Sequence, residues 1–426
     1  MRYLPREEQS RKEMLEAIGV SSVDELYKDV PEKAFIKGLA DLPNHMGELE
    51  VERKIGGYAN QNRAAPDGPF FLGAGCYYHH IPSTVDYIIQ RSEFLTAYTP
   101  YQPEIAQGTL TAIFEYQTFI AQLTGQEIAN ASLYDGATAM VEAALMARRL
   151  TRRTKVVLGN DILPDYRAVL ESYNENYEDA QITEGKPDDE TACVIIQSPD
   201  LYGQPHGYDD WRKMCDETGA LLVVVIPEIV SLGLLPAPEV ADIVCGEAQS
   251  IGLPMSFGGP HLGFFATSMK YVRQMPGRLC GETVDEDGNR SFVLTLNTRE
   301  QHIRRDKATS NICTNQGLCA LAFTVHMSLL GEDGFKRLAL LNHEATIRFV
   351  DAVSKVDGVK VVNDAFFNEV TLELRKDAHE VVDALAEKNI IAGFPLDENK
   401  LLCAVTEMTT AADVAEFCAA LKEVLA

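Results

Sequence analysis

Short apolar runs alternate with helical stretches along most of the chain, and this alternation predicts its fold class. Runs of strand-forming residues lie at 156–158, 193–197, 221–226, 243–245 and 262–266. Helical segments or loops, among them 166–173 and 211–218, separate most of these runs. Continuous apolar strands that alternate with helices are typical of a mainly parallel sheet covered on both faces. The pattern therefore predicts an α/β domain in which helices sandwich the sheet.

The two ends of the chain differ from this middle part. The pattern of the first 65 residues predicts helices without strands, and Ser22 and Glu25 have the spacing of a capping box. This segment has too few apolar residues to form a core of its own. Long helical stretches at 316–330 and 334–353 precede short strands and helices up to residue 425. The 426 residues also exceed the ~250–300 at which a single core stops growing. We expect a helical arm (1–65), a large α/β domain (66–330) and a small α+β domain (331–426).

Composition and charge restrict which binding partners and which cellular compartment we expect for this chain. Lys and Arg number 38 against 63 Asp and Glu, which gives a formal net charge of −25. Such an acidic chain repels phosphate backbones and anionic lipids, so neither nucleic acid nor a membrane is an expected partner. The longest apolar run, 220–226, is far shorter than the ~20 residues that span a bilayer. A charged N-terminal segment and nine cysteines without a C-x-x-C pair favour a cytoplasmic protein with free thiols and no structural zinc.

A loop between a predicted strand and a predicted helix is a candidate anion site. It contains Asp135, Gly136, Ala137 and Thr138. Free backbone N–H groups and the positive end of the helix dipole favour a phosphate there. The simpler interpretation is a tight turn with Asp135 or Thr138 as the helix cap. No G-x-G-x-x-G motif opens a helix, so a nicotinamide-binding domain is not expected.

Three further segments concentrate polar and aromatic groups. Segment 98–108 carries two prolines, and it is either a rigid connector or a loop that presents side chains to a ligand or partner. Neighbouring His79 and His80 point to opposite sides of an extended chain, so joint metal ligation is not expected. Segment 304–316 could bind a carboxylate, a phosphate or a neighbouring subunit, although capping of the next helix by Thr314 explains it more simply.

Together, the strings 98–108, 130–139 and 307–316 resemble the N-terminal half of the P-protein of the glycine cleavage system, and 256–265 also fits. This resemblance covers nearly the whole chain and implies the pyridoxal-phosphate-dependent transferase fold type I. It also implies the activity, the decarboxylation of glycine and transfer of the aminomethyl group to the lipoamide of the H-protein. In some bacteria the enzyme is split into two chains. This chain resembles the first, the α subunit, which implies a β subunit in an α2β2 assembly and a lipoylated H-protein as partners.

One residue that this family chemistry requires is missing. A fold type I site needs a lysine at a strand end for the Schiff base and an acid at an earlier strand end for the pyridinium nitrogen. No lysine lies between residues 214 and 269, and Ser250 stands at the lysine position that the resemblance indicates. Ile226 and Pro227 stand where the acid is expected, with Glu228 following. Because serine cannot form a Schiff base, the resemblance implies that pyridoxal phosphate resides on the β subunit.

The expected role of this chain is then to complete the partner's site. Loop side chains could close and desolvate it, and the candidates are Tyr98, Tyr101, Gln102 and Glu104, followed by His79 and His80. Two alternatives stay open at this point. An autonomous pyridoxal-phosphate transferase would use Lys270 or Lys307 as its lysine. A non-catalytic scaffold would only stabilise the β subunit.

Overall fold

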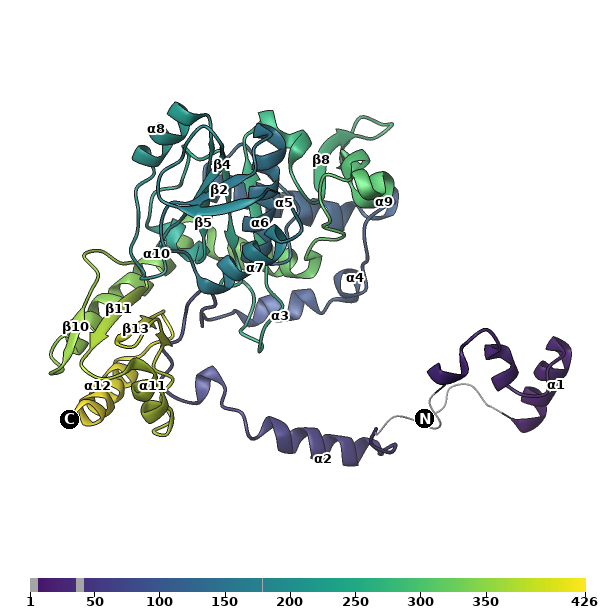
Figure 1. The fold of residues 1–426 in the computed structure, drawn as a ribbon, viewed down its shortest axis with the longest axis horizontal. Helices are drawn as coiled ribbons and strands as arrows, with labels where there is room; N and C mark the ends of the chain where they lie inside the picture. Colours follow the sequence, from purple (N-terminus) through teal and green to yellow (C-terminus); the bar gives the residue numbers. More distant parts are fainter. Residues whose placement is uncertain (1–6, 36–41, 178) are drawn as a thin grey trace. The chain divides into compact units, whose positions relative to one another are not determined.

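The structure is a computed structural model that describes residues 7–35, 42–177 and 179–426 (Figure 1). It divides into two compact units, Met1–Ala64 and Ala65–Ala426. The described residues of the first unit form the short helices α1 (Glu8–Ile18), η1 (Asp24–Tyr27), η2 (Glu32–Ala34) and α2 (Glu48–Ala59). None of its described residues is buried, so these residues form no core of their own. The predicted boundaries at 65 and 330 stay predictions.

A seven-stranded sheet forms the centre of the second unit, in the order β1-β7-β6-β5-β4-β2-β3. All neighbours pair in parallel except β7, which runs antiparallel to both β1 and β6. The strands are β1 (Ile128–Ala129), β2 (Lys155–Leu158), β3 (Gln181–Glu184), β4 (Thr191–Gln197), β5 (Leu221–Ile226), β6 (Ile243–Glu247) and β7 (Gly263–Thr267). The expectation of a mainly parallel sheet is confirmed.

Helices cover both faces of this sheet because successive strand residues point to opposite sides. In β5, Leu222, Val224 and Ile226 pack in one apolar cluster with α5 (Gln107–Thr124) and α10 (Gly317–Val353). Leu221 and Val223 pack in a second cluster with α6 (Gly136–Thr151) and α7 (Pro164–Asn174). All six β5 residues are buried, as expected of a strand between two helical layers.

Smaller elements surround this core. Before β1 lie η3 (Ala65–Asp67), α3 (Ser83–Ile89), α4 (Ser92–Leu95) and η4 (Pro103–Ile105). Between β4 and α10 lie α8 (Asp209–Thr218), η5 (Ile229–Gly233), η6 (Met269–Gln274), the hairpin β8 (Leu279–Val284) and β9 (Arg290–Thr295), η7 (Asn297–Arg299), α9 (Gln301–Arg304) and η8 (Arg305–Lys307). Both long helical stretches predicted from the sequence are confirmed. The two stretches follow one another within α10 and meet at Gly331, where a φ of 62° interrupts the helix.

The C-terminal part carries its own four-stranded antiparallel sheet, in the order β10-β11-β13-β12. Its elements are β10 (Val359–Val361), β11 (Glu369–Leu374), α11 (Ala378–Ala386), β12 (Phe394–Pro395), β13 (Lys400–Ala404) and α12 (Ala411–Leu425). The rings of Phe71, Phe349 and Phe417 pack within 5.5 Å of one another in its core. Phe71 therefore ties the segment before α3 to this sheet. None of the described helices is long and apolar enough to cross a membrane.

Candidate functional site

The carboxyl ends of the parallel strands meet at one edge of the seven-stranded sheet, where ligands bind in open α/β sheets. Ser250 follows the end of β6 by three residues, and Glu228 follows the end of β5 by two. Both are buried, with exposed fractions of 3% and 1%. The Ser250 hydroxyl donates a hydrogen bond of 2.9 Å to Oε2 of Glu228. Ser250, at the position where the resemblance implies a lysine, is thus buried and bonded within the chain.

A buried histidine extends this contact toward the C-terminal sheet. His79 Nε2 lies 3.1 Å from Oε2 of Glu228, and its Nδ1 lies 2.9 Å from Oε2 of Glu407, which follows β13. The other oxygen of Glu407 accepts a hydrogen bond from the His80 backbone N–H at 2.7 Å. The Asn342 side chain on α10 donates another to Glu407 Oε2 at 3.1 Å. We call Ser250, Glu228, His79 and Glu407 the internal ion network.

Electrostatics in this network keep His79 protonated. Burial alone opposes a charged imidazole, but the attraction of Glu407 and Glu228 outweighs it and raises the pKa of His79 to about 10. Burial likewise opposes the Glu407 carboxylate, and the neighbouring imidazolium overcomes this and lowers the pKa of Glu407 to about 2. At neutral pH the network therefore holds a protonated His79 imidazole against the ionised Glu407 carboxylate.

The predicted phosphate loop lies at the start of α6, but two carboxylates of the chain already use its N–H groups. Asp135 is the helix cap, and its Oδ1 accepts a 2.7 Å hydrogen bond from Thr138 N. Oε2 of the buried Glu247 accepts one of 3.0 Å from Gly136 N. Its Oε1 accepts further hydrogen bonds from the backbones of Gln249 and Leu262. Glu247 thus takes the place at the helix end where a phosphate would bind.

Tyr166 of α7 closes the space over Gly136. A Cβ built on Gly136 would lie 2.0 Å from the Tyr166 hydroxyl oxygen and 3.0 Å from the Glu247 Cβ. Tyr166 is 7% exposed, and in the described residues its hydroxyl has no hydrogen-bond partner. The glycine at the start of α6 is required by this close approach.

Replacing Gly136 with alanine should lower the free energy of unfolding by about 1–3 kcal/mol, because the new methyl group collides with Tyr166. Adding Tyr166→Phe removes the nearest atom and should restore part of the loss, because Cζ of the ring still lies 2.9 Å from the new methyl group. Gly108→Ala is the matched control, because no atom lies within 4 Å of its built Cβ. Chemical denaturation measures all three, and equal stabilities of the Gly136 and Gly108 variants would contradict this packing.

These residues do not fit pyridoxal phosphate in this chain. The cofactor needs a lysine, whereas Ser250 donates to Glu228. It also needs free N–H groups for its phosphate, and Glu247 and Asp135 accept from them. A cavity of about 310 Å³ remains beside the start of α6, but its lining includes the acidic residues Asp135, Asp165 and Glu247 against a single basic residue, His261. Such a lining disfavours an anion.

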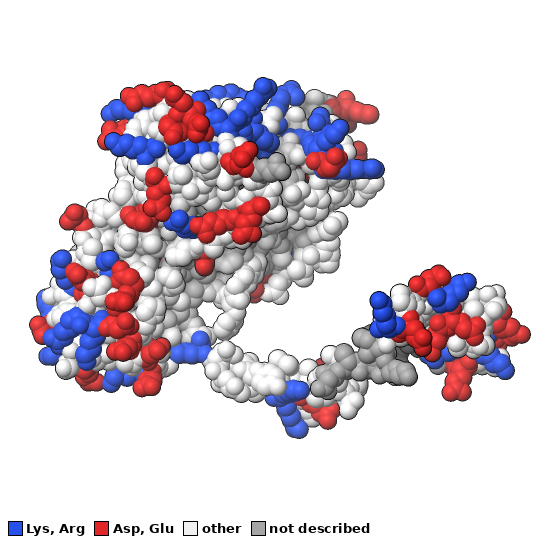
Figure 2. All heavy atoms as spheres, viewed as in Figure 1, with Lys and Arg blue, Asp and Glu red and all other residues white. Residues whose placement is uncertain are grey.

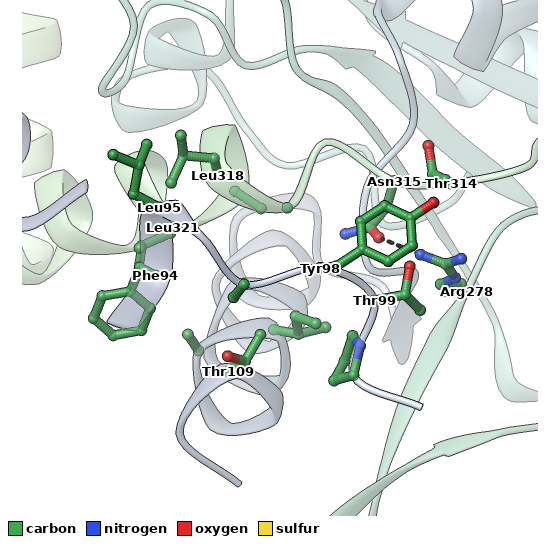
Figure 3. A pocket seen from close by; sticks show the side chains of 16 residues that line it. Phe94, Leu95, Tyr98, Thr99, Thr109, Arg278, Thr314, Asn315, Leu318 and Leu321 are labelled. Atoms are coloured by element: carbon green, nitrogen blue, oxygen red, sulfur yellow. Dashed lines mark hydrogen bonds between the residues drawn. The ribbon is translucent and has the colours of Figure 1, made fainter. Parts of the chain in front are cut away.

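The site-completing candidates of segment 98–108 lie elsewhere, on the surface. Tyr98, Tyr101, Gln102 and Glu104 are all exposed, and Tyr98 retains 80% of its accessible area. Figure 3 shows Tyr98 at a cavity of about 210 Å³ beside Thr99, Thr314, Asn315 and Arg278. The guanidinium of Arg278 lies 5.8 Å from the ring centroid of Tyr101. The structure therefore brings segment 98–108 together with the predicted polar segment 304–316.

Comparison with known proteins decides the family. Residues 1–421 match the family model described as the glycine cleavage system P-protein. The chain belongs to this family. It is 55% identical to the probable glycine dehydrogenase (decarboxylating) subunit 1 of Parvibaculum lavamentivorans, and 53% identical to the protein of that name from Sphingopyxis alaskensis. Each comparison covers 100% of both chains.

Solved structures agree with this assignment to the P-protein family. An inhibitor-bound glycine decarboxylase (P-protein) of the glycine cleavage system matches over 100% of both chains, with 42% identity and a TM-score of 0.91. A Burkholderia pseudomallei sphingosine-1-phosphate lyase covers 93% of this chain and 94% of its own, with 14% identity and a TM-score of 0.64. The second likeness shows the fold alone. The expected pyridoxal-phosphate-dependent fold type I is confirmed.

Several expectations for the P-protein site residues need correction. Thr314 does not cap the next helix, because α10 begins after Gln316 and no side chain caps it. The strand end after β5 is not apolar, since Glu228 reaches Ser250 there. His79 is 5% exposed with both ring nitrogens engaged within the chain, and its expected role stays a prediction. His80 is exposed, and its expected role stays a prediction.

Sequence reasoning also missed residues that define these sites. Glu247, Glu407 and Arg278 lie far apart in the sequence and meet their partners only after folding. A signal existed for Glu247 alone, because it is an acidic residue at the end of an otherwise apolar strand, and such a residue is rarely buried without partners. In the described part of the chain, no group of His, Cys, Asp or Glu is arranged to hold a metal ion.

Proposed function

We propose that this chain is the α subunit of a glycine dehydrogenase (decarboxylating) and works only with a lysine-bearing β subunit. The β subunit holds pyridoxal phosphate, which supplies the electron sink for loss of the glycine carboxylate. The aminomethyl group passes to the lipoamide of the lipoylated H-protein, in a cytoplasmic α2β2 enzyme. The observation that carries this proposal is Ser250, which stands at the lysine position and is bonded to Glu228.

The remaining lysines do not support an autonomous transferase. Lys270 follows β7, whose Thr267 pairs with Ile243 at the beginning of β6, so Lys270 lies at the opposite edge of the sheet from Ser250. Its side chain is 63% exposed and lies 3.7 Å from Asp242. Lys307 is also exposed. Neither lysine has the buried surroundings that lower the pKa of a Schiff-base lysine.

Two surface features support contact with a partner subunit. Figure 2 shows a broad area of the second unit with few charged side chains, between a charged upper edge and the charged C-terminal part. Segment 87–105 exposes large apolar side chains of α3, α4 and the following loop, namely Tyr87, Leu95, Tyr98, Tyr101 and Ile105. Exposed aromatic residues grouped in this way mark protein interfaces more often than solvated surface. We assign this segment to the contact with the β subunit.

The isolated chain offers a direct test of the missing lysine. Purified alone and mixed with pyridoxal phosphate, it should show no visible absorption band of a lysine-bound cofactor and no cofactor retained after borohydride reduction. Lys270→Gln and Lys307→Gln variants identify any reaction at surface lysines. A stable visible band that neither variant removes would contradict the proposal.

In the assembled enzyme, Tyr101→Ala should lower kcat/KM for glycine by about tenfold or more, because it removes the ring that packs on Arg278 at the proposed contact. Tyr173→Ala on α7 is the control for loss of a partly exposed tyrosine and should stay within about twofold of the unchanged enzyme. Steady-state kinetics and the affinity between the subunits are measured together. Unchanged turnover and unchanged glycine affinity would show that the assignment of segment 98–108 is wrong.

A further inference from the structure

Residues 313–316 form an irregular segment at the cavity of Figure 3. They follow the buried Ile312, precede α10 and lie in no helix or strand. Thr314 and Asn315 line the cavity near Tyr98. A backbone without a regular hydrogen-bond pattern needs other acceptors, such as side chains, for its N–H groups. The shape of segment 313–316 therefore depends on the side chains that accept from it.

Tyr134 accepts from two consecutive N–H groups of this segment. Its hydroxyl oxygen accepts hydrogen bonds from the backbone N–H groups of Cys313 at 2.9 Å and of Thr314 at 3.4 Å. These residues are 179 and 180 positions away from Tyr134 in the sequence. Because one oxygen atom serves both N–H groups, removal of the Tyr134 hydroxyl takes the acceptor from both.

Ser132 supplies a third acceptor from an unusual backbone conformation. It is fully buried, and its φ of 112° lies in a region that residues other than glycine rarely adopt. Its own N–H donates to Oδ1 of Asn130 at 3.2 Å. In this conformation its Oγ accepts a 2.9 Å hydrogen bond from the Gln316 N–H, directly before α10. Backbone strain of this kind persists where the surrounding contacts enforce it, and it is frequent at functional sites.

Residues 130–134 also hold other parts of the cavity wall. The Ala131 N–H donates to the backbone carbonyl of Arg278 at 2.9 Å. The Ala131 carbonyl in turn accepts from Nδ2 of Asn315 at 3.1 Å. Arg278 lies against the ring of Tyr101, on the segment assigned above to the contact with the β subunit. One short stretch of chain thus fixes several residues of the proposed contact.

We propose that Ser132 and Tyr134 are positioning residues for the reaction of the assembled enzyme. They act through segment 313–316 and hold it in the shape in which it meets the β subunit beside segment 98–108. This inference rests on the proposed function, because the contact exists only in the assembled enzyme, whereas the hydrogen bonds belong to this chain alone. It gives the motif 130–139 a role other than phosphate binding, since carboxylates of the chain accept from N–H groups at the start of α6.

Tyr134→Phe tests the first step in the isolated chain. The variant keeps the ring and removes only the hydroxyl, so hydrogen exchange of the backbone at 313–316 should accelerate by about tenfold or more. Mass spectrometry of the peptides that cover this segment measures the exchange. Tyr166→Phe is the matched control, because in the described residues the buried Tyr166 hydroxyl has no hydrogen-bond partner. It should change exchange at 313–316 by less than about twofold.

The second step is tested in the assembled enzyme at a saturating concentration of the β subunit. Tyr134→Phe should lower kcat for glycine by about tenfold or more, because a small displacement of groups around the reacting atoms costs this much. Tyr166→Phe should stay within about twofold of the unchanged enzyme. A purely structural role of Tyr134 would lower the free energy of unfolding and leave kcat of the folded, saturated enzyme unchanged. Ser132→Gly adopts the same φ without strain and lacks the third acceptor, so it should also accelerate exchange and lower kcat, and it keeps the test valid if Tyr134→Phe does not fold.

Faster exchange at 313–316 together with a lower kcat supports the proposal. Unchanged exchange in both Tyr134→Phe and Ser132→Gly would overturn it, whatever the kinetics. Faster exchange with an unchanged kcat would overturn it as well. In that case the Tyr101→Ala variant separates the two claims. A loss of kcat/KM in Tyr101→Ala would leave the proposed contact intact, whereas unchanged kinetics in Tyr101→Ala too would show that the contact assignment itself is wrong.

Discussion

The His79→Leu variant should unfold with a free energy about 3–5 kcal/mol lower than that of the unchanged chain. Leucine fills the space of the imidazole but leaves Glu228 and Glu407 as buried carboxylates without their shared counter-charge, and breaking a buried ion pair on one side costs about this much. Urea denaturation measures the change. His379→Leu, at an exposed histidine at the start of α11, is the control and should change the stability by less than about 0.5 kcal/mol. Equal stabilities of the two variants would contradict the network.

The stabilising effect of His79 should also depend on pH in a defined direction. The pKa of His79 rises from 6.5 to about 10 in the folded chain, so its contribution is complete below pH 6.5 and disappears as the pH rises through 10. The pKa of Glu407 falls from 4.5 to about 2, so its contribution is present above pH 4.5 and disappears as the pH falls toward 2. The stability difference between the unchanged chain and His79→Leu should therefore shrink steadily from pH 6.5 to pH 10. A difference that stays constant over this range would show that the histidine is neutral in the folded chain.

Glu247→Ala should lower the free energy of unfolding by about 3 kcal/mol or more. The change removes the acceptor for the backbone N–H groups of Gly136, Gln249 and Leu262, and each buried unsatisfied donor costs about 1–3 kcal/mol. Glu247→Gln keeps one acceptor oxygen and should cost less than the alanine variant. Glu286→Ala, at the exposed tip of the β8–β9 hairpin, controls for the loss of a negative charge. If Glu247→Ala were no less stable than this control, Glu247 would not hold the start of α6.

The fold could be predicted from the sequence because local pattern and tertiary structure agree. Continuous apolar runs such as 221–226 became buried strands, and the two helical stretches on either side of Gly331 were visible as separate periodic segments. The lysine gap around Ser250 also carried information, because a Schiff base tolerates no other side chain. These features depend on residues close together in the sequence or on a single position.

The internal ion network could not be predicted, because its members meet only after folding. His79 and Glu407 are 328 positions apart, and His79 and Glu228 are 149 apart. The contact of Glu247 with Gly136, outside this network, likewise joins residues 111 positions apart. The sequence showed a phosphate loop at 135–138 but not the carboxylate that accepts from its N–H group. It likewise showed two neighbouring histidines, but not that burial and two carboxylates would fix one of them as an imidazolium. Long-range pairing of this kind leaves no periodic pattern.

We propose that this chain lacks its own catalytic lysine and completes the site of a β subunit. Exchange of the glycine carboxyl group with labelled CO2 is the most direct test of this role. The exchange is measured with pyridoxal phosphate and H-protein for the α chain alone, the β chain alone and the mixture. We expect activity in the mixture, none in the α chain alone and a loss of about tenfold or more in the β chain alone. Exchange by the β chain alone at the rate of the mixture would contradict the claim and leave the α chain as a scaffold.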